Sequence, residues 1–165
     1  MAASRIVVRL ARPGDVRSIA SVLRRAFAEY ESSYTPEAFA ATTPGPDEIQ
    51  RRIDQGPVWV ATLSGDIVGT VSALQRATDL HIRSMAAVPS ARGSGIGGLL
   101  LREIERFAFL HGCRRLTLCT TPFLARAIAL YRSFGFERAD EGPEDIHGTP
   151  LLTMTKRLND GFRLN

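Results

Sequence analysis

One stretch of ten residues constrains the fold of this chain more than any other. Residues 91–100 read ARGSGIGGLL, so four glycines stand within and directly before an apolar run. A strand-like segment, residues 79–88, precedes them, and apolar residues follow at helical spacing: Ile96, Leu99, Leu100, Ile104, Phe107 and Ala108. A glycine in a first helical turn destabilises the helix by about 1 kcal/mol relative to alanine. The pattern therefore predicts a helix N-terminus whose bare backbone N–H groups bind a phosphate.

Two kinds of phosphate ligand are compatible with this loop. Gly93, Gly95 and Gly98 match the dinucleotide fingerprint G-x-G-x-x-G, whereas Arg92, Gly95 and Gly97 match a different pattern, Arg-x-x-Gly-x-Gly. A dinucleotide site also needs an acidic residue at the end of the next strand, and this strand ends on Thr120 and Thr121. The Gly-Lys-Ser/Thr of a nucleoside-triphosphate loop is absent as well. The sequence therefore disfavours both kinds of nucleotide site.

Helical and strand patterns alternate along the rest of the 165 residues, in the predicted order βααβββαβαββ. The first helix is expected from Val16 to about Tyr30, with Asp15 as its cap. Residues 31–46 are rich in Pro, Thr and Ser and indicate a long loop or a broken helix. A short helix is expected over residues 47–56. The pattern is that of a mixed α/β protein with one sheet and helices on both faces.

Turn and helix-start residues also predict a hairpin, a late helix and the two faces of the strand before the glycine loop. A hairpin is expected to turn at Ser64-Gly65-Asp66, and a late helix to open at Pro122. Along the strand before the glycine loop, side chains should alternate between two faces. Leu80, Ile82, Ser84 and Ala86 are expected on one face, and His81, Arg83, Met85 and Ala87 on the other.

Composition excludes several classes of partner. The formal net charge of +4 comes with arginines scattered as pairs, so we expect no nucleic-acid partner. No apolar run approaches the ~20 residues that span a bilayer and no signal peptide opens the chain, so we expect no membrane partner and a cytoplasmic location. Cys113 and Cys119 should lie roughly 20 Å apart along one strand, too far for a disulfide. No Cys or His cluster has metal-ligand spacing, so we expect no metal.

The segments SMAAVPSARGSGIGGLLL and ARAIALYRSFGF together resemble the GNAT family of N-acetyltransferases. Arg92, Gly95 and Gly97 match its acetyl-CoA loop, and a second motif matches at Ala127, Tyr131, Gly135 and Phe136. The resemblance covers roughly residues 4–158. It implies one α/β domain over residues 4–158, with a mixed, mostly antiparallel sheet and helices on both faces, followed by a C-terminal tail, residues 159–165.

The resemblance also implies an activity, the acetyl-CoA-dependent transfer of an acetyl group to a primary amine of a small molecule or protein. Transfer would be direct, in a ternary complex. The strand before the glycine loop would part from its neighbour at a bulged tip near Pro89, where backbone groups of Ala87 and Val88 would bind the pantetheine arm of acetyl-CoA. The pyrophosphate would be held by the loop residues Arg92, Gly93, Ser94, Gly95, Ile96, Gly97 and Gly98.

The spacing of Tyr131 from Ala127 and Phe134 puts it on the inward face of its helix, which on its own indicates a core tyrosine. The same resemblance makes Tyr131 the candidate general acid for the departing thiolate. The general base is less constrained: His81 is one candidate, an ordinary half-exposed strand histidine is the alternative, and water would also serve. Tyr30, Glu31 and Tyr34 are expected to line the acceptor pocket, where glutamates weakly suggest a cationic amine.

Leu124 stands where relatives often carry an Asn that contacts cofactor or substrate. This difference keeps open an alternative function, a non-catalytic module that binds or senses acyl-CoA. A homodimer is a further possibility that the resemblance raises.

Overall fold

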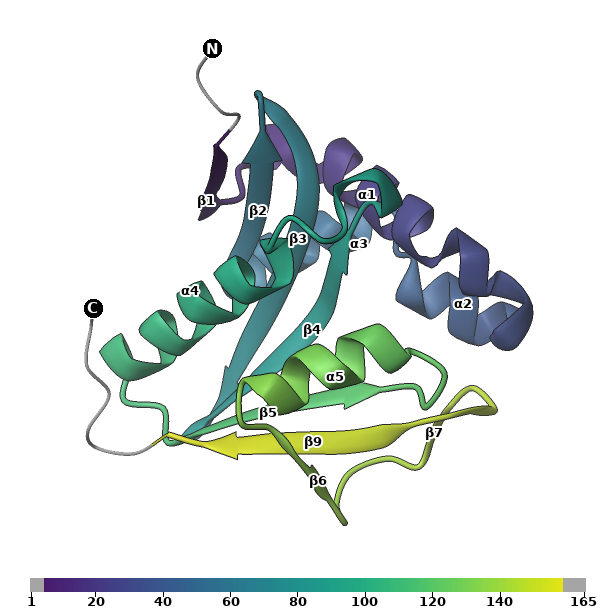
Figure 1. Cartoon of the computed structure of the whole chain (residues 1–165), viewed down its shortest axis with the longest axis vertical. Helices are drawn as coiled ribbons and strands as arrows, with labels where there is room; N and C mark the ends of the chain where they lie inside the picture. Colours follow the sequence, from purple (N-terminus) through teal and green to yellow (C-terminus); the bar gives the residue numbers. More distant parts are fainter. Residues whose placement is uncertain (1–4, 159–165) are drawn as a thin grey trace.

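The strands of the computed structural model, which describes residues 5–158, form one seven-stranded sheet in the order β1-β2-β3-β4-β5-β9-β6 (Figure 1). The strands are β1 (Ile6–Leu10), β2 (Val58–Leu63), β3 (Asp66–Arg76), β4 (Asp79–Ala87), β5 (Arg115–Thr120), β6 (Glu137–Ala139) and β9 (Leu152–Arg157). Only the β4–β5 pair is parallel among the described strands, which confirms a mixed, mostly antiparallel sheet. A small hairpin of β7 (Asp145–Ile146) and β8 (Thr149–Pro150), which the sequence did not predict, lies outside this sheet. The predicted tail, residues 159–165, lies outside the described residues.

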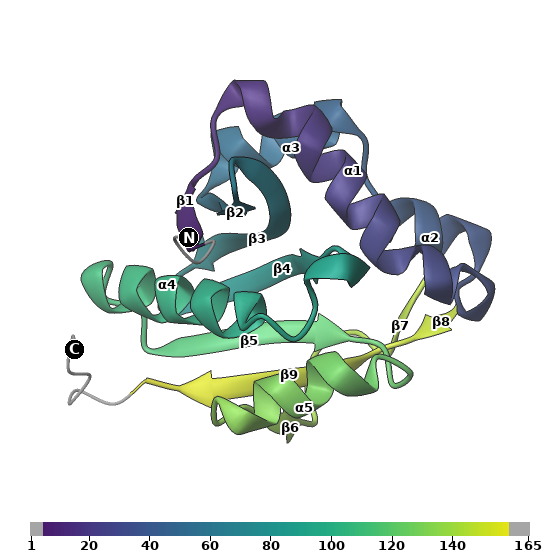
Figure 2. The same ribbon diagram turned by 45° about the horizontal axis from the view of Figure 1, so that its top comes forward.

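Helices cover both faces of the sheet, as predicted (Figures 1 and 2). One face carries α1 (Val16–Phe27), α2 (Pro36–Thr42) and α3 (Pro46–Gln55), and the other carries α4 (Ile96–Leu110) and α5 (Ala125–Ser133). The core lies between the sheet and these helices. Ile19 and Leu23 of α1 and Leu100 and Ile104 of α4 are almost completely buried. The ring of Trp59 on β2 packs edge-on against Phe107 of α4, with ring centroids 5.6 Å apart.

The first helix is shorter than its sequence pattern predicts. It ends at Phe27, and a 3₁₀ segment, η2 (Ala28–Ser33), continues the chain to α2. Thr35 begins α2, because its hydroxyl accepts a hydrogen bond from the Ala38 N–H at 3.2 Å. Residues 31–46 are therefore a broken helix and not a long loop.

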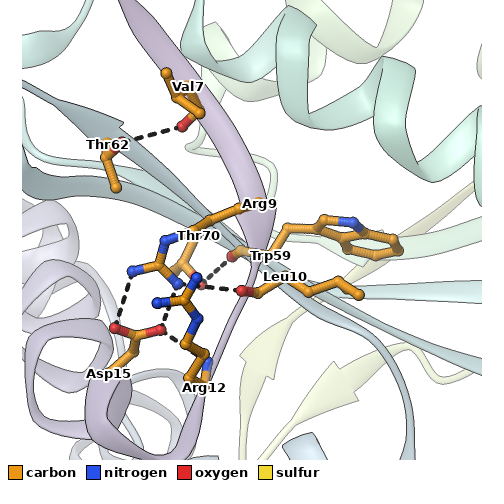
Figure 3. Close-up of polar contacts among 8 residues, drawn as sticks. All are labelled: Val7, Arg9, Leu10, Arg12, Asp15, Trp59, Thr62 and Thr70. Atoms are coloured by element: carbon orange, nitrogen blue, oxygen red, sulfur yellow. Dashed lines mark hydrogen bonds and ion pairs between the residues drawn. The ribbon is translucent and has the colours of Figure 1, made fainter.

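Asp15 occupies the predicted cap position of α1, but its carboxylate makes no capping bond to the helix. It points back toward β1, where Nη1 and Nη2 of Arg9 donate to its two oxygens at 2.7 and 3.1 Å (Figure 3). The Arg12 N–H donates to the same carboxylate at 2.8 Å, within the 3₁₀ turn η1 (Pro13–Asp15). The Arg9 guanidinium is the main cause of the lowered pKa of Asp15. The predicted cap position is thus confirmed, but the side chain makes no capping bond to α1 and instead ties β1 to the start of the helix.

A β-bulge reverses the predicted side-chain alternation on β4. Arg83 pairs with Ser72 of β3 and Ala86 with Thr70, so β4 advances three residues where β3 advances two. The extra residue is accommodated at Ser84, whose φ is +51°. Beyond the bulge, Ala86 therefore shares the face of His81 and Arg83, and the predicted faces are wrong from Ser84 onward.

The late helix also starts after its predicted position. The Leu124 N–H donates to the Thr121 carbonyl at 3.1 Å, which closes a turn, and α5 begins only at Ala125. Pro122 therefore lies in the turn and does not open the helix. Leu124 becomes the cap residue of α5.

Candidate active site

The central feature is a cavity of 840 Å³ where β4 and β5 part. The two strands pair in parallel only from Asp79 and Arg115 to Ile82 and Leu118, and then diverge, as Figure 1 shows toward the right of the view. The cavity wall contains β4 residues on both sides of the bulge, the end of β5, the glycine loop and the start of α4. Parts of α1, η2, α2, α3 and α5 complete it. The cavity therefore reaches elements on both faces of the sheet.

The glycine loop has the geometry of an anion cradle. Gly93 and Gly95 both have φ of +83°, a conformation that side-chain-bearing residues rarely adopt. The first helical hydrogen bond of α4 runs from the Leu99 N–H to the Gly95 carbonyl at 3.1 Å. Within the described part of the chain, none of the N–H groups of residues 93–98 donates a hydrogen bond. These N–H groups are available to a bound anion at the positive end of the α4 dipole.

Gly97 has a packing role as well. A Cβ at this position would lie 2.4 Å from Cδ2 of Leu130, so the missing side chain lets the start of α4 approach α5 closely. Gly98 has more room, because its Cβ would meet the Phe134 ring at an ordinary 3.6 Å. The glycine loop and the helix that carries Tyr131 are thereby held against each other.

Most of the predicted cofactor residues line the cavity: Ala87, Arg92, Gly93, Gly95, Ile96, Gly97 and Gly98. Val88 and Ser94 are not part of the wall. The Val88 N–H donates to the Val68 carbonyl at 2.9 Å, and the Ser94 hydroxyl donates to the Ala91 carbonyl. Neither of these groups is presented to a ligand.

Arg92 lines the cavity, but its guanidinium braces the loop against α1 and η2. Nη1 pairs with the carboxylate of Glu29, and Nη2 donates to the Ala26 carbonyl at 3.0 Å. Its charge is therefore already matched by an acidic partner. The backbone of the loop, more than the Arg92 side chain, is what a phosphate would meet.

Tyr131 lies on α5 in the cavity wall, with only 6% of its surface exposed. Burial raises the pKa of its hydroxyl far above the usual value, and the neighbouring Tyr34 adds to the effect. The phenol is therefore protonated at neutral pH. A protonated hydroxyl in a buried wall can act as a proton donor.

His81 lies on β4 before the bulge, also in the wall. Its Nδ1 is 2.8 Å from the Thr117 hydroxyl, so proton transfer to a ligand would use Nε2. Burial lowers the pKa of His81, and the charges of Arg76 and Arg83 lower it further. The imidazole is therefore neutral at pH 7 and able to accept a proton.

The structure brings two of the three predicted acceptor residues to the cavity. Tyr30 and Tyr34 line it, and the Tyr34 ring packs edge-on against Phe123 with centroids 4.9 Å apart. Burial raises the pKa of Tyr34, an effect that the nearby Thr121 and Thr42 hydroxyls oppose. Glu31 is exposed on η2 and does not reach the wall.

Two arginines that the sequence did not single out also contribute to the wall, Arg52 of α3 and Arg83 of β4. Nη1 of Arg52 donates to the Ser84 hydroxyl at 2.7 Å, next to the bulge. The side chains meet through the bulge and the packing of α3. The packing of α3 has no local signal in the sequence, and the resemblance implies a bulge near Pro89 without giving its register between Arg83 and Ala86.

Among the described residues, no group of His, Cys, Asp and Glu side chains has the arrangement of a metal site. Cys113 and Cys119 are both free thiols, as their spacing predicts. In the same part of the chain, no helix is long and apolar enough to cross a bilayer.

Comparison with known sequences places the chain in a family. The acetyltransferase (GNAT) family model matches residues 19–136. An uncharacterised N-acetyltransferase of Escherichia coli, YjgM, is 32% identical over 132 residues, which cover 76% of this chain and 78% of that protein. The N-acetylaspartate synthetase of Danio rerio is 39% identical over 85 residues, covering 50% of this chain and 30% of that protein. The match thus spans about a third of the length of the synthetase.

Solved structures share the fold. PaiA N-acetyltransferase of Thermoplasma acidophilum, in complex with coenzyme A, has a TM-score of 0.81 at 16% identity, covering 93% of this chain and 99% of that one. YncA of Salmonella typhimurium, with acetyl-CoA, has a TM-score of 0.74 at 20% identity, covering 98% and 99%. These similarities confirm the predicted fold class, and the sequence match extends over most of the chain. The chain belongs to the GNAT family of acetyltransferases.

Proposed function

We propose that this protein is an acetyl-CoA-dependent N-acetyltransferase that moves an acetyl group to a primary amine. The observation that carries the proposal is the run of unbonded N–H groups over residues 93–98, because all of these residues except Ser94 line the same cavity as Tyr131. Family membership supports acetyl transfer, and the fold neighbours bound to coenzyme A or acetyl-CoA support the donor. Bound acetyl-CoA supplies an activated acyl thioester. The N–H groups would hold its pyrophosphate, and the backbone of Ala87 its pantetheine arm.

The two candidate catalytic side chains have complementary protonation states. The Tyr131 hydroxyl, which burial keeps protonated, would give a proton to the departing sulfur. Neutral His81 would take a proton from the attacking amine through Nε2, directly or through water. Each such transfer accelerates a reaction by about 10²–10⁴-fold. Both steps occur within one ternary complex, without a covalent acyl-enzyme.

A second candidate function is a module that binds acyl-CoA without turnover. Leu124 supports it, because this apolar side chain lines the cavity where relatives often have Asn. The neutral His81 and protonated Tyr131 in the same wall favour the enzyme.

The first test is a thermal-shift comparison of the purified protein with acetyl-CoA, coenzyme A, NADH and no ligand at fixed salt. A ligand at a hundred times its Kd stabilises by about 2.7 kcal/mol, which is about 5–10 °C in Tm for a domain of this size. We expect a shift with acetyl-CoA and coenzyme A and none with NADH. Release of the coenzyme A thiol from acetyl-CoA is then measured in the presence of amines. An enzyme releases the thiol, whereas a binding module does not. No shift with either coenzyme A species would refute both functions.

Three further expectations belong to the proposal. We place the catalytic domain at residues 4–158, and a truncation after residue 158 that keeps full activity would support that boundary. The free thiols of Cys113 and Cys119 support a reducing, cytoplasmic location, which cell fractionation tests. A homodimer is tested by light scattering on the purified protein.

A further inference from the structure

One end of the cavity carries positive charge with few partners. Arg52 of α3 and Arg83 of β4, here called the arginine pair, both line it beside the β4 bulge. The Nε atom of Arg52 and the Nε and Nη2 atoms of Arg83 are buried and make no hydrogen bond. Guanidinium N–H groups removed from water and left without an acceptor are strongly unfavourable. Such donors therefore indicate a site that an anionic ligand completes.

Acidic side chains do not balance this charge. Glu48 is the carboxylate that faces the arginine pair, with its Oε1 3.7 Å from Nε of Arg52. It is 43% exposed and also bonds Arg51 at 3.1 Å, so it is shared and largely hydrated. Arg76 adds a further positive charge near Arg83. The cavity wall formed by the described residues contains no Asp or Glu.

The position of the arginine pair separates it from the phosphate cradle. Arg52 reaches the cavity from α3, on the face of the sheet opposite α4 and α5, while the glycine loop begins α4 (Figure 2). The pair therefore lies away from the phosphate cradle, in the same cavity wall as Tyr30 and Tyr34, which the resemblance assigns to the acceptor pocket. His81 and Arg83 share one face of β4, with Cα atoms roughly 7 Å apart. A ligand held by Arg83 would lie beside the candidate base.

The geometry points to a carboxylate-bearing amine as the acceptor: we propose that the arginine pair binds the carboxylate of a free amino acid or an acidic peptide N-terminus. A planar guanidinium matches the two oxygens of a carboxylate with parallel N–H donors. This inference rests on the proposed function and narrows its acceptor class. It replaces the cationic amine that the glutamates of the sequence suggested, because Glu31 lies outside the wall and Glu29 is bound to Arg92.

The test begins with binding. The protein saturated with coenzyme A is titrated calorimetrically with L-aspartate, L-glutamate, a Glu-Ala dipeptide, the diamide of L-aspartate, and spermidine. We expect heat of binding with carboxylate-bearing amines and none with spermidine. Turnover with acetyl-CoA should favour L-aspartate over its diamide by about tenfold or more in kcat/KM. Preference for the dipeptide over free amino acids would place the carboxylate on a polypeptide. Equal or better use of the diamide or spermidine overturns the proposal.

Variants assign the effect to the arginine pair. Arg83→Gln and Arg52→Gln should each raise the KM for the acidic amine about tenfold, while the thermal shift with acetyl-CoA stays unchanged. Arg83→Lys should recover part of the loss, and Arg17→Gln, which removes an exposed charge from α1, should change neither quantity. A lost acetyl-CoA shift in folded Arg83→Gln would assign the pair to the cofactor and overturn the acceptor site. Absence of any acetyl-CoA shift in the unmodified protein would instead refute the proposed function itself.

Discussion

Tyr131 is the cavity-wall residue whose proposed role as proton donor can be tested by removing a single hydroxyl. Replacing it with Phe keeps the ring in its contact with Phe136, 5.9 Å between centroids, and removes only the hydroxyl. We expect Tyr131→Phe to lower kcat by about 10²–10⁴-fold, because the departing thiolate loses its proton donor. The acetyl-CoA thermal shift should be unchanged. Initial-rate measurement of thiol release checks this, and an unchanged kcat would assign the acid to another group.

His81 should set the acid limb of the pH profile. Burial and nearby arginines lower its pKa, so the imidazole loses its base function only as the pH falls below its usual value of 6.5. At saturating acceptor, kcat should therefore be level near pH 7 and decline below about pH 6.5. In His81→Gln the rate should be low throughout and this decline should disappear. A decline that persists in the variant would show that a different group titrates.

Residue-scale prediction from the sequence succeeded where the signal was local. The glycine run begins a helix with unbonded N–H groups, as its pattern predicts, and Tyr131 is buried on the inward side of its helix, as its spacing indicates. Glu31, which the resemblance places in the acceptor pocket, is exposed on η2, although Tyr30 of the same segment lines the cavity. Arg52 and Arg83 had no local signal, since a bulge and a packed helix bring them together.

At the scale of elements, the contact between α4 and α5 depends on a bare backbone at Gly97. Gly97→Ala places a methyl group 2.4 Å from Cδ2 of Leu130, so the Leu130 side chain, or α5 with it, must shift. We expect a loss of about 1–3 kcal/mol in the free energy of unfolding, measured by urea denaturation without ligand. Gly98→Ala is the matched control, because its methyl group meets Phe134 at 3.6 Å and alanine favours the helix. Equal stability of the two variants would contradict the packing role of Gly97.

The junction of β1 and α1 gives a prediction about pH. Asp15→Asn should lower the free energy of unfolding by about 1–2 kcal/mol at pH 7, because the bonds to Arg9 lose their charge. The folded pKa of Asp15 lies below its unfolded value, so this stabilisation is present above about pH 4 and is lost as the pH falls through the lowered pKa. Denaturation at pH 7 and pH 3 should show a gap between wild type and variant that narrows. Asp140→Asn, at an exposed carboxylate, should show no comparable gap at either pH.

The whole fold was more predictable than its central opening. A helix between strands β4 and β5 makes a parallel pair natural, whereas the hairpin from β2 to β3 must be antiparallel. The family motifs add the expectation that β4 parts from its neighbour. The shape of that opening depends on where pairing stops, after Ile82 and Leu118, and on the extra residue near Ser84. The alternation of side chains along a strand predicts neither the residue at which pairing stops nor the position of the extra residue.

A cavity that reaches both faces of the sheet lets donor and acceptor bind at the same time, and this predicts the kinetic order of the whole molecule. Direct transfer requires both substrates before any product leaves, so double-reciprocal plots should intersect. Cys119 tests the alternative, because this residue lines the cavity and a free thiol is a nucleophile that can carry an acetyl group. We expect Cys119→Ala to keep most of the activity, and protein incubated with acetyl-CoA alone to gain no acetyl group by mass spectrometry. The alternative predicts parallel plots, acetylation of Cys119, and a Cys119→Ala variant that binds acetyl-CoA but is inactive. These three results together would show that the acetyl group is first transferred to the protein.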